Sequence, residues 1–279
     1  MTVNTGTTIL DKIVKHKLLE IAAAKAIVSI QHLEETKLFQ RACYSLKEFM
    51  LAPERTGIIA EFKRASPSKG IINDRVNVAA VTSGYAQAGA SALSVLTDSE
   101  FFGGNINDLI QAREANTIPI LRKEFILDEY QIIEAKAMGA DIILLIAAIL
   151  TPQQISTFAS LAKGLGLSVL LEVHNQQELE QSLCDELDAV GVNNRNLADF
   201  SVSLQHSYDL VNQIPAQFLK VSESGISNPK TIHELKQAGF NGFLIGENFM
   251  KEDDPGMAMM EFVAEINALD SLSDDKLKG

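Results

Sequence analysis

Charged and amide side chains end several of the short apolar runs in this sequence. In chain order they are Glu61, Lys63, Lys123, Glu172, Asn193, Arg195 and Glu223. Where lysines and carboxylates meet at one site, they can pass protons to and from a substrate, which is general acid–base catalysis. Glu61 and Lys63 lie two residues apart, so on a strand their side chains share one face and Phe62 takes the other. Because buried charges are costly unless they pair or serve a site, these two residues are either a stabilising ion pair or part of the chemistry.

Two later loops have the composition of an anion site. Ser224 and Gly225 follow one apolar run, and Gly246 and Glu247 follow the next, each just before a predicted helix. Free backbone N–H groups and the helix dipole attract anions at such positions. A single glycine there would make only a tight turn, but the pair in adjacent units predicts a site for a phosphate ester.

Phe101 and Phe102 stand in a loop in front of two glycines. An aromatic ring in this place can close on an apolar or aromatic part of a substrate, while the alternative is that one ring, Phe101 in particular, packs beneath the loop. The five histidines and two cysteines show neither the spacing of metal ligands nor a CxxC pair, and no nucleotide-binding motif is present. We therefore expect no metal and no cofactor.

The elements that position these residues are eight short apolar runs, which alternate with helix-length amphipathic stretches. They are residues 57–63, 92–97, 118–122, 141–146, 168–172, 189–193, 218–223 and 242–245. Gly89, Gly139 and Gly239 each close a helical stretch before such a run, which supports a repeated unit. Continuous apolar strands that alternate with helices predict a buried parallel sheet, and eight units favour a closed (β/α)8 TIM barrel. The active site of such a barrel lies at the carboxyl ends of its strands, where the charged residues stand.

The remainder of the sequence fits one domain over residues 1–279, with residues 1–50 as an N-terminal helical extension that packs across one end of the barrel. Its helix is predicted to start at a capping box formed by Thr8 and Asp11. The net charge of −12 argues against a nucleic-acid or membrane partner. The longest apolar run, residues 142–150, is too short to span a bilayer, and the polar start does not resemble a secretory signal. We expect a cytoplasmic protein.

Five segments together resemble the indole-3-glycerol-phosphate synthase family, and the resemblance extends from about Ile9 through Met250. They are residues 59–70 (IAEFKRASPSKG), 93–97 (LSVLT), 119–123 (PILRK), 190–195 (VGVNNR) and 221–226 (VSESGI). The resemblance implies a TIM barrel whose N-terminal helix lies over the barrel mouth. It also implies ring closure of 1-(2-carboxyphenylamino)-1-deoxyribulose 5-phosphate to indole-3-glycerol phosphate, with loss of carbon dioxide and water.

The same resemblance implies catalytic roles. Lys123 would be the general acid that protonates the ketone oxygen during ring closure, and Glu172 would be the acid/base partner for the later dehydration. Lys63 would hold a substrate anion and take part in proton transfer. Glu61 and Glu223 would orient the lysines and the substrate hydroxyls.

The remaining positions would bind the substrate. Asn193, which is also counted with the catalytic residues, and Arg195 would hold its chain. Phe102 would pack on the anthranilate ring, and Ser66 would line the side of the first strand. The phosphate would be held by Ser224, Gly225, Gly246 and the backbone of Glu247. Because a carboxylate repels phosphate, we expect the Glu247 side chain to point away.

Two properties of the site are left as expectations. Barrel walls and neighbouring cations are expected to lower the pKa of the catalytic lysine toward neutrality. The alternatives to acid–base catalysis are a class I aldolase-like barrel, in which Lys63 or Lys123 forms a Schiff base, and a non-catalytic barrel that binds a sugar phosphate. The expected partner is a small phosphorylated molecule, with the chain itself a monomer or weak homo-oligomer.

Overall fold

Eight parallel strands close into a barrel in the computed structural model, which describes residues 8–196 and 200–277. They are β1 (Ile58–Phe62), β4 (Ala92–Leu96), β5 (Ile120–Lys123), β6 (Ile142–Ile146), β7 (Ser168–Val173), β8 (Ala189–Asn193), β9 (Leu219–Glu223) and β10 (Gly242–Ile245). The barrel closes because β1 pairs in parallel with both β10 and β4. Each predicted run agrees with one strand to within two residues at either end, so the predicted (β/α)8 barrel is confirmed.

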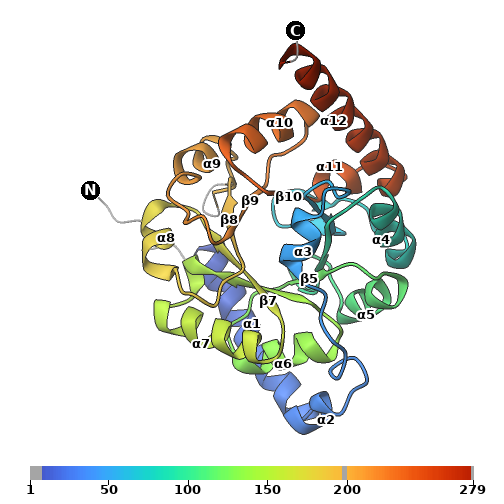
Figure 1. Cartoon of the computed structure of the whole chain (residues 1–279). Helices are drawn as coiled ribbons and strands as arrows, with labels where there is room; N and C mark the ends of the chain where they lie inside the picture. Colours follow the sequence, from blue (N-terminus) through green and yellow to red (C-terminus); the bar gives the residue numbers. More distant parts are fainter. Residues whose placement is uncertain (1–7, 197–199, 278–279) are drawn as a thin grey trace.

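Helices form the outer ring of the molecule (Figure 1). They are α4 (Val78–Gln87), α5 (Ile106–Ala115), α6 (Glu129–Ala137), α7 (Pro152–Gly164), α8 (Gln176–Ser182), α9 (Gln205–Leu210), α10 (Pro229–Ala238), α11 (Glu247–Met250) and α12 (Pro255–Leu277). A short hairpin, β2 (Ala65–Ser66) and β3 (Gly70–Ile71), follows β1. Within the described residues, none of the helices is both long and apolar enough to cross a membrane.

Glycines turn the chain from helix to strand, as the repeated unit of the sequence predicted. Gly139 and Gly239 follow α6 and α10 with φ angles of 88° and 110°, in the left-handed region that glycine enters without steric cost. At Gly139 a Cβ atom would also lie only 2.6 Å from Cγ of Arg113. The tight turn at each glycine therefore fixes where the following strand begins.

The side chains of each strand alternate between the lumen and the outer helices. Ile58, Ala60 and Phe62 of β1 pack in the large apolar cluster between the strands and the helices, which is called the outer cluster. Ile59 belongs to the smaller apolar cluster inside the barrel, which is called the lumen cluster. This alternation places Glu61 on the lumen side and Phe62 outside, as predicted. Apolar residues fill the lower lumen, so the charged residues gather above them at the carboxyl ends of the strands.

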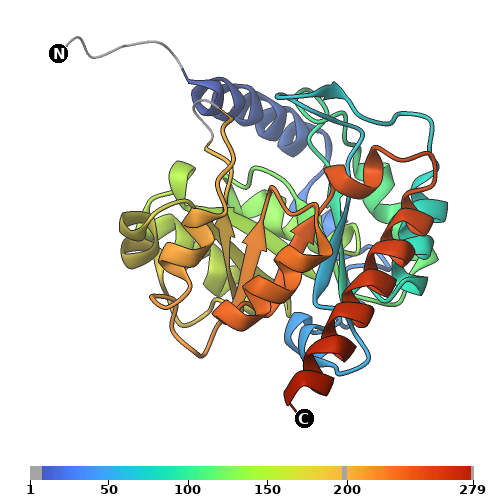
Figure 2. The same cartoon turned by 90° about the horizontal axis from the view of Figure 1, so that it is seen from above.

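Helix α1 (Ile9–Ile27) lies across the carboxyl ends of the strands, at the top of Figure 2. Its predicted capping box is present, because Asp11 N donates to Thr8 Oγ1 at 3.1 Å and Thr8 N donates to the Asp11 carboxylate at 2.8 Å. Buried Lys17 fastens the helix with two ion pairs of 2.9 Å each, to Asp98 beyond β4 and Glu124 beyond β5. Helix α1 therefore covers the barrel mouth and is held there by the buried ammonium group of Lys17.

The rest of the N-terminal segment runs to the opposite end of the barrel. After α2 (Ile30–Glu34), α3 (Leu46–Leu51) lies at the lower end of Figure 2. Leu46 and Met50 pack into the lumen cluster, and Leu46 N donates to Ser168 Oγ, 3.4 Å away at the start of β7. The expectation that residues 1–50 lie over the mouth does not hold for α3, which packs at the opposite end from α1, while residues 1–7 are outside the described part.

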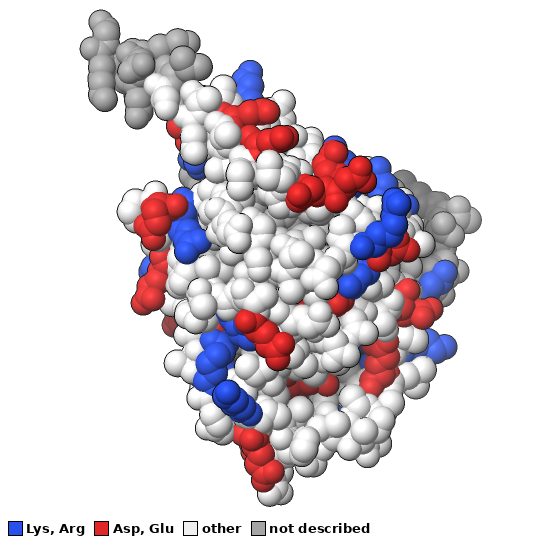
Figure 3. Space-filling view, turned by 90° about the vertical axis from the view of Figure 1, so that its right-hand side faces the viewer, with Lys and Arg blue, Asp and Glu red and all other residues white. Residues whose placement is uncertain are grey.

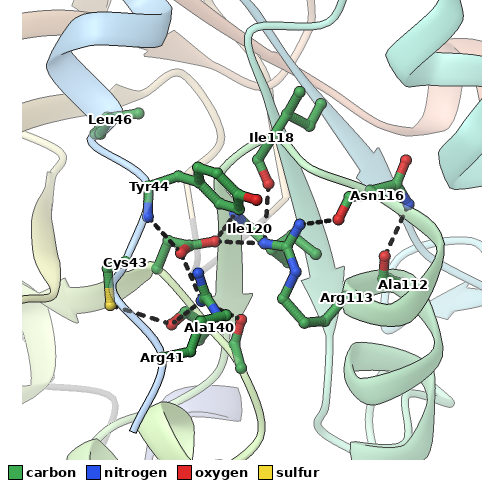
Figure 4. A network of polar contacts seen from close by, with 12 residues as sticks. Arg41, Cys43, Tyr44, Leu46, Ala112, Arg113, Asn116, Ile118, Ile120 and Ala140 are labelled. Atoms are coloured by element: carbon green, nitrogen blue, oxygen red, sulfur yellow. Dashed lines mark hydrogen bonds and ion pairs between the residues drawn. The ribbon is translucent and has the colours of Figure 1, made fainter. Parts of the chain in front are cut away.

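A group of charges at this lower end, the lower cluster, comprises buried Asp141 and Arg113 and half-buried Arg41 (Figure 4). Oδ1 of Asp141 accepts from Arg41 at 2.7 Å and from Tyr44 N at 2.8 Å, and Oδ2 accepts from Arg113 at 2.8 Å and from Ile120 N at 2.9 Å. The carboxylate is inaccessible to solvent. It ties the segment before α3 to α5 and to the start of β5.

The outer surface carries mixed charge. On the face shown in Figure 3, basic and acidic side chains are interspersed among wide neutral areas, and the basic ones do not gather into one patch. The whole chain has 36 acidic and 24 basic residues. That face therefore lacks the continuous positive surface on which nucleic-acid binding depends.

Candidate active site

A cavity of about 950 Å³, including solvent at its opening, lies between the barrel mouth and α1. Eleven of the thirteen predicted site residues line it: Glu61, Lys63, Ser66, Phe102, Lys123, Glu172, Asn193, Arg195, Glu223, Ser224 and Glu247. Gly225 and Gly246 do not line the cavity themselves but are chain neighbours of Ser224 and Glu247, which do. The structure thus brings the predicted residues to one place.

Three charged side chains meet at the floor of this cavity and are called the mouth cluster: Lys123, Glu172 and Glu223. Lys123 Nζ lies 3.0 Å from Glu172 Oε2 and 2.9 Å from Glu223 Oε2. They come from β5, β7 and β9, and inward side chains of alternate strands share one layer in a barrel of this type. Asn193 Nδ2 donates to the other oxygen of Glu172 at 3.0 Å, which fixes that carboxylate.

The charge environment of Lys123 differs from the expectation. Burial alone would lower the pKa of Lys123, but the charges of Glu172, Glu223 and Glu61 outweigh this effect and raise the pKa above its ordinary value. The expected shift toward neutrality is therefore wrong, because carboxylates rather than cations surround the ammonium group. Lys123 therefore carries its proton throughout the pH range in which enzymes ordinarily work.

The two carboxylates of the mouth cluster are not equivalent. Both are buried, which raises the pKa of each, but Lys123, His174 and Asn193 together hold the pKa of Glu172 well below its ordinary range. For Glu223, burial and the neighbouring charge of Glu172 prevail over Lys123 and raise the pKa to about 7. Oε1 of Glu223 has no hydrogen-bond partner among the described residues. The cluster therefore contains one fixed carboxylate and one that can hold a proton near neutral pH.

Glu61 and Lys63 form a second charged pair beside this cluster. Lys63 Nζ lies 2.8 Å from Glu61 Oε1, and Ser94 Oγ is 3.4 Å from Glu61 Oε2. A Cβ atom at Gly246 would lie 2.6 Å from Glu61 Oε1, so that glycine leaves room for the carboxylate. Both charged residues line the cavity, so Glu61 and Lys63 form an ion pair and are also part of the candidate site.

The rim of the cavity holds the predicted phosphate loops. Ser224 and Gly225 have consecutive left-handed φ angles of 69° and 77°, a conformation that costs a serine free energy and that its surroundings must enforce. The Glu247 carboxylate does not point away as expected but lines the cavity, 3.7 Å from Arg195 and 3.5 Å from Lys69. These two cations draw it inward.

Asn194 is a positioning residue that the sequence interpretation missed. Its fully buried side chain donates to Glu223 O at 3.0 Å and to Ser224 O at 3.2 Å, and accepts from Ser207 Oγ at 2.9 Å. It therefore fixes the end of β9 and the strained serine. Alternation was the available signal, because a residue beside lumen-facing Asn193 faces the opposite way and a polar side chain there needs partners.

His174 follows β7 directly and contacts the site. Its Nε2 lies 3.7 Å from Glu172 and its Nδ1 lies 3.3 Å from Glu178. Burial would lower the pKa of this imidazole, but its hydrogen bond to the Glu178 carboxylate and the nearby carboxylate charges raise the pKa. When protonated, His174 places positive charge beside Glu172.

One wall of the cavity is apolar. Phe102 lines it, with its ring 5.9 Å from that of Phe125, and α1 adds Leu10 and Ile13. Phe101 instead packs edge-on against His16 of α1, as the alternative for this loop stated. Phe125 and the α1 side chains were missed because hydrophobic periodicity does not separate a cavity wall from a core.

Comparison with known proteins identifies the family. The family model described as indole-3-glycerol phosphate synthase matches residues 10–262. The chain belongs to this family. A relative of that name from Bacteroides thetaiotaomicron is 45% identical over 258 residues, which are 92% of this chain and 98% of the relative. Another from Laribacter hongkongensis is 44% identical over 260 residues, or 92% and 99%. Members of the family are decarboxylating lyases of tryptophan biosynthesis, and so is this chain.

Solved structures with the same fold are more distant. A mutant tryptophan synthase α-subunit from the hyperthermophile Pyrococcus furiosus gives a TM-score of 0.59 at 16% identity, covering 76% of this chain and 98% of that one. A 3-hexulose-6-phosphate synthase gives 0.58 at 14% identity, covering 76% and 100%. At such identities they show the barrel fold alone. Among the described residues of this family member, no three His, Cys, Asp or Glu side chains are grouped to hold a metal ion.

Proposed function

We propose that this chain converts 1-(2-carboxyphenylamino)-1-deoxyribulose 5-phosphate to indole-3-glycerol phosphate with residues of the mouth cluster as acid and base. The observation that carries this assignment is the position of Lys123, which lies within 3.0 Å of both Glu172 and Glu223 on the cavity floor. A protonated lysine beside one ionised carboxylate and one protonatable carboxylate provides an acid, a base and a local proton reserve.

Ring closure uses Lys123 as general acid. A ring carbon of the anthranilate attacks the ketone carbon of the sugar chain, and the ketone oxygen takes a proton from Nζ to become a hydroxyl group. The raised pKa of Lys123 keeps that proton in place until negative charge develops on the oxygen. Glu223, whose pKa is about 7, is suited to return a proton to the lysine.

The later steps use Glu172 and Lys63. Attack leaves positive charge on the ring system, which nearby carboxylates stabilise until carbon dioxide departs and its bonding electron pair returns to the ring. Dehydration then requires a base for the ring proton and an acid for the leaving hydroxyl group. Glu172, held ionised by its neighbours, is placed for the first task, and Lys63 lines the same cavity for the second.

The cavity also supplies separate binding regions. Phe102 and Phe125 offer aromatic surface to the anthranilate ring, and Asn193 and Arg195 reach the sugar chain. We assign the phosphate to Ser66 and to the two rim loops, Ser224 with Gly225 and Gly246 with the backbone of Glu247. Phosphate would then compete with the Glu247 carboxylate for Arg195, whose guanidinium group lies 3.7 Å from that carboxylate.

The charge on Lys123 disfavours the Schiff-base alternative at this lysine. A lysine must be neutral to attack a carbonyl carbon, and the pKa of this ammonium is raised rather than lowered. Trapping of a covalent adduct by borohydride would reverse that preference. We also propose that the reaction takes place in the cytoplasm. We propose in addition that the chain is a monomer or weak homo-oligomer, and chromatography at several protein concentrations measures this oligomeric state.

The decisive experiment mixes purified, metal-chelated protein with the carboxyphenylamino-deoxyribulose phosphate and follows indole fluorescence. We expect a steady rise without any added cofactor. Saturable binding of the compound without a rise would indicate a sugar-phosphate-binding protein instead. The same reaction with borohydride, followed by mass measurement, separates acid–base catalysis from the aldolase-like route.

A further inference from the structure

We propose that Gly191 is a positioning residue for catalysis, because the Glu223 carboxylate occupies the space that any side chain at position 191 would need. The proposal deepens the function proposed above and rests on it for its kinetic part. It concerns a residue in the middle of β8 that looks, in the sequence, like an ordinary strand glycine.

Position 191 faces the lumen beside the mouth cluster. Val190 and Val192 pack in the outer cluster, whereas Ala189 belongs to the lumen cluster, so Gly191 shares the inner face with Ala189. In the strand register Gly191 lies opposite Glu172 of β7. A side chain here would project directly among the catalytic carboxylates.

The space for that side chain is already filled. An ideal Cβ atom on Gly191 would overlap with Oε1 of Glu223 and lie 3.2 Å from its Cδ atom. Leu170 Cδ1 stands 3.3 Å away, which restricts the free space. The carboxylate cannot swing aside freely, because its Oε2 atom holds Lys123 at 2.9 Å. A methyl group at position 191 would therefore displace Glu223 and loosen its bond to Lys123.

Backbone conformation does not explain this glycine. Gly191 is not among the described residues with a positive φ angle, so its backbone is one that other residues adopt. A glycine inside a strand lowers stability and is a mark of close approach by other atoms. Here the approaching atom is the unpartnered, buried Oε1 of Glu223. Room for that carboxylate is the reason for the glycine.

Gly242 provides a matched control in the same barrel. It also lies in a lumen strand without a positive φ angle, and its Cβ atom would meet Met50 Cε at 2.6 Å and Val221 Cγ2 at 3.0 Å. Those neighbours belong to the apolar lower lumen. Gly242→Ala therefore tests crowding of the barrel without displacing a charge of the mouth cluster.

The kinetic test is a double-mutant cycle between Gly191→Ala and Glu223→Ala. We expect Gly191→Ala to lower kcat about 100-fold with KM changed less than about threefold, because a displacement of about 1 Å at a reacting group has effects of this order. In the Glu223→Ala background the same change should alter kcat less than about threefold, since the opposing atoms are gone. Gly242→Ala should have the same small effect in both backgrounds. An equal loss from Gly191→Ala in both backgrounds would overturn the proposal.

Thermal unfolding keeps the proposal testable if Gly191→Ala folds poorly. We expect Gly191→Ala to lower the Tm of the wild-type chain by more than it lowers the Tm of the Glu223→Ala variant, whereas Gly242→Ala lowers both equally. A Gly191→Ala decrease of the same size in both backgrounds contradicts the steric conflict. This measurement needs no substrate, so an inactive wild-type protein would refute the proposed function and leave the steric conflict to be decided separately.

Discussion

Buried charges gather at both ends of this barrel, but they are satisfied to different degrees. In the lower cluster one carboxylate, Asp141, receives hydrogen bonds from two arginines and two backbone N–H groups. In the mouth cluster the ratio is reversed, since one ammonium group, that of Lys123, serves the carboxylates of Glu172 and Glu223. Oε1 of Glu223 is left buried without a partner.

The difference separates stability from catalysis. A buried carboxylate with both oxygens satisfied, such as that of Asp141, makes a structure rigid, even though Nε of Arg41 in the same cluster is buried without a partner. An unsatisfied carboxylate oxygen such as Oε1 of Glu223 costs free energy that other parts of the fold must offset. The lower cluster fixes the starts of the strands, and the mouth cluster keeps an acceptor and a proton free for a substrate. Active sites commonly exchange stability for function in this way. The comparison predicts opposite outcomes for variants at the two ends.

The largest expected effect is on turnover, in Lys123→Ala. Loss of the general acid should reduce kcat by about 10³-fold, within the usual range for a positioned acid, while the folded protein still binds phosphate compounds. Lys163→Ala removes a lysine whose ion pair with Asp188 is exposed, and should leave kcat unchanged. Indole fluorescence measures both. Substantial residual turnover in Lys123→Ala would remove the lysine from that role.

Asp141→Ala should affect stability instead. It leaves buried Arg113 and half-buried Arg41 without their shared carboxylate, and loss of one partner of a buried ion pair typically costs about 3 to 5 kcal/mol of unfolding free energy. Urea unfolding measures the loss, and kcat per folded molecule should stay at the wild-type value. Lys163→Ala again serves as the control, with an expected cost below about 1 kcal/mol. A fall in kcat without a fall in stability would break the proposed division between the two ends.

Glu223→Gln should stabilise the fold in a pH-dependent way. Folding raises the pKa of Glu223 from 4.5 to about 7, so this residue favours the folded state fully below pH 4.5 and loses that contribution as the pH rises through 7. Glutamine has no such dependence. The variant should therefore gain about 1 to 3 kcal/mol over wild type between pH 5 and pH 8 while losing activity. Urea unfolding at both pH values checks this, and a constant difference would show that Glu223 does not titrate as described.

The sequence was sufficient to predict the barrel and the end of it at which the candidate site residues gather, because both follow from local patterns. Strand alternation put Glu61 on the inner face, and parallel strands put Lys123, Glu172 and Glu223 at the same end of the barrel. These inferences need only the period of a strand and the direction of the sheet. They hold wherever the pattern is continuous.

Properties set by distances between remote residues were not predictable. The pKa of Lys123 depends on which charges lie within a few ångströms, and these come from positions 49 and 100 residues away. A six-residue helix such as α3 can cover either end of a barrel, and only the packing of Leu46 decides which. The orientation of Glu247 likewise depends on two cations from other loops. The purpose of Gly191 becomes visible only beside Glu223.

The smallest expected effect concerns the apolar wall, and it separates binding from the charge chemistry of the mouth cluster. Phe102→Ala should raise KM about tenfold, equivalent to about 1.4 kcal/mol, because an aromatic contact of this kind acts on the bound ring before and during the reaction alike. The neighbouring variant Phe101→Ala is the control, since Phe101 packs on His16 of α1 and does not line the cavity. Initial rates over a range of substrate concentrations give both constants. A lower kcat at unchanged KM in Phe102→Ala would mean that the ring acts only in the transition state, and the apolar wall would then belong with the catalytic charges.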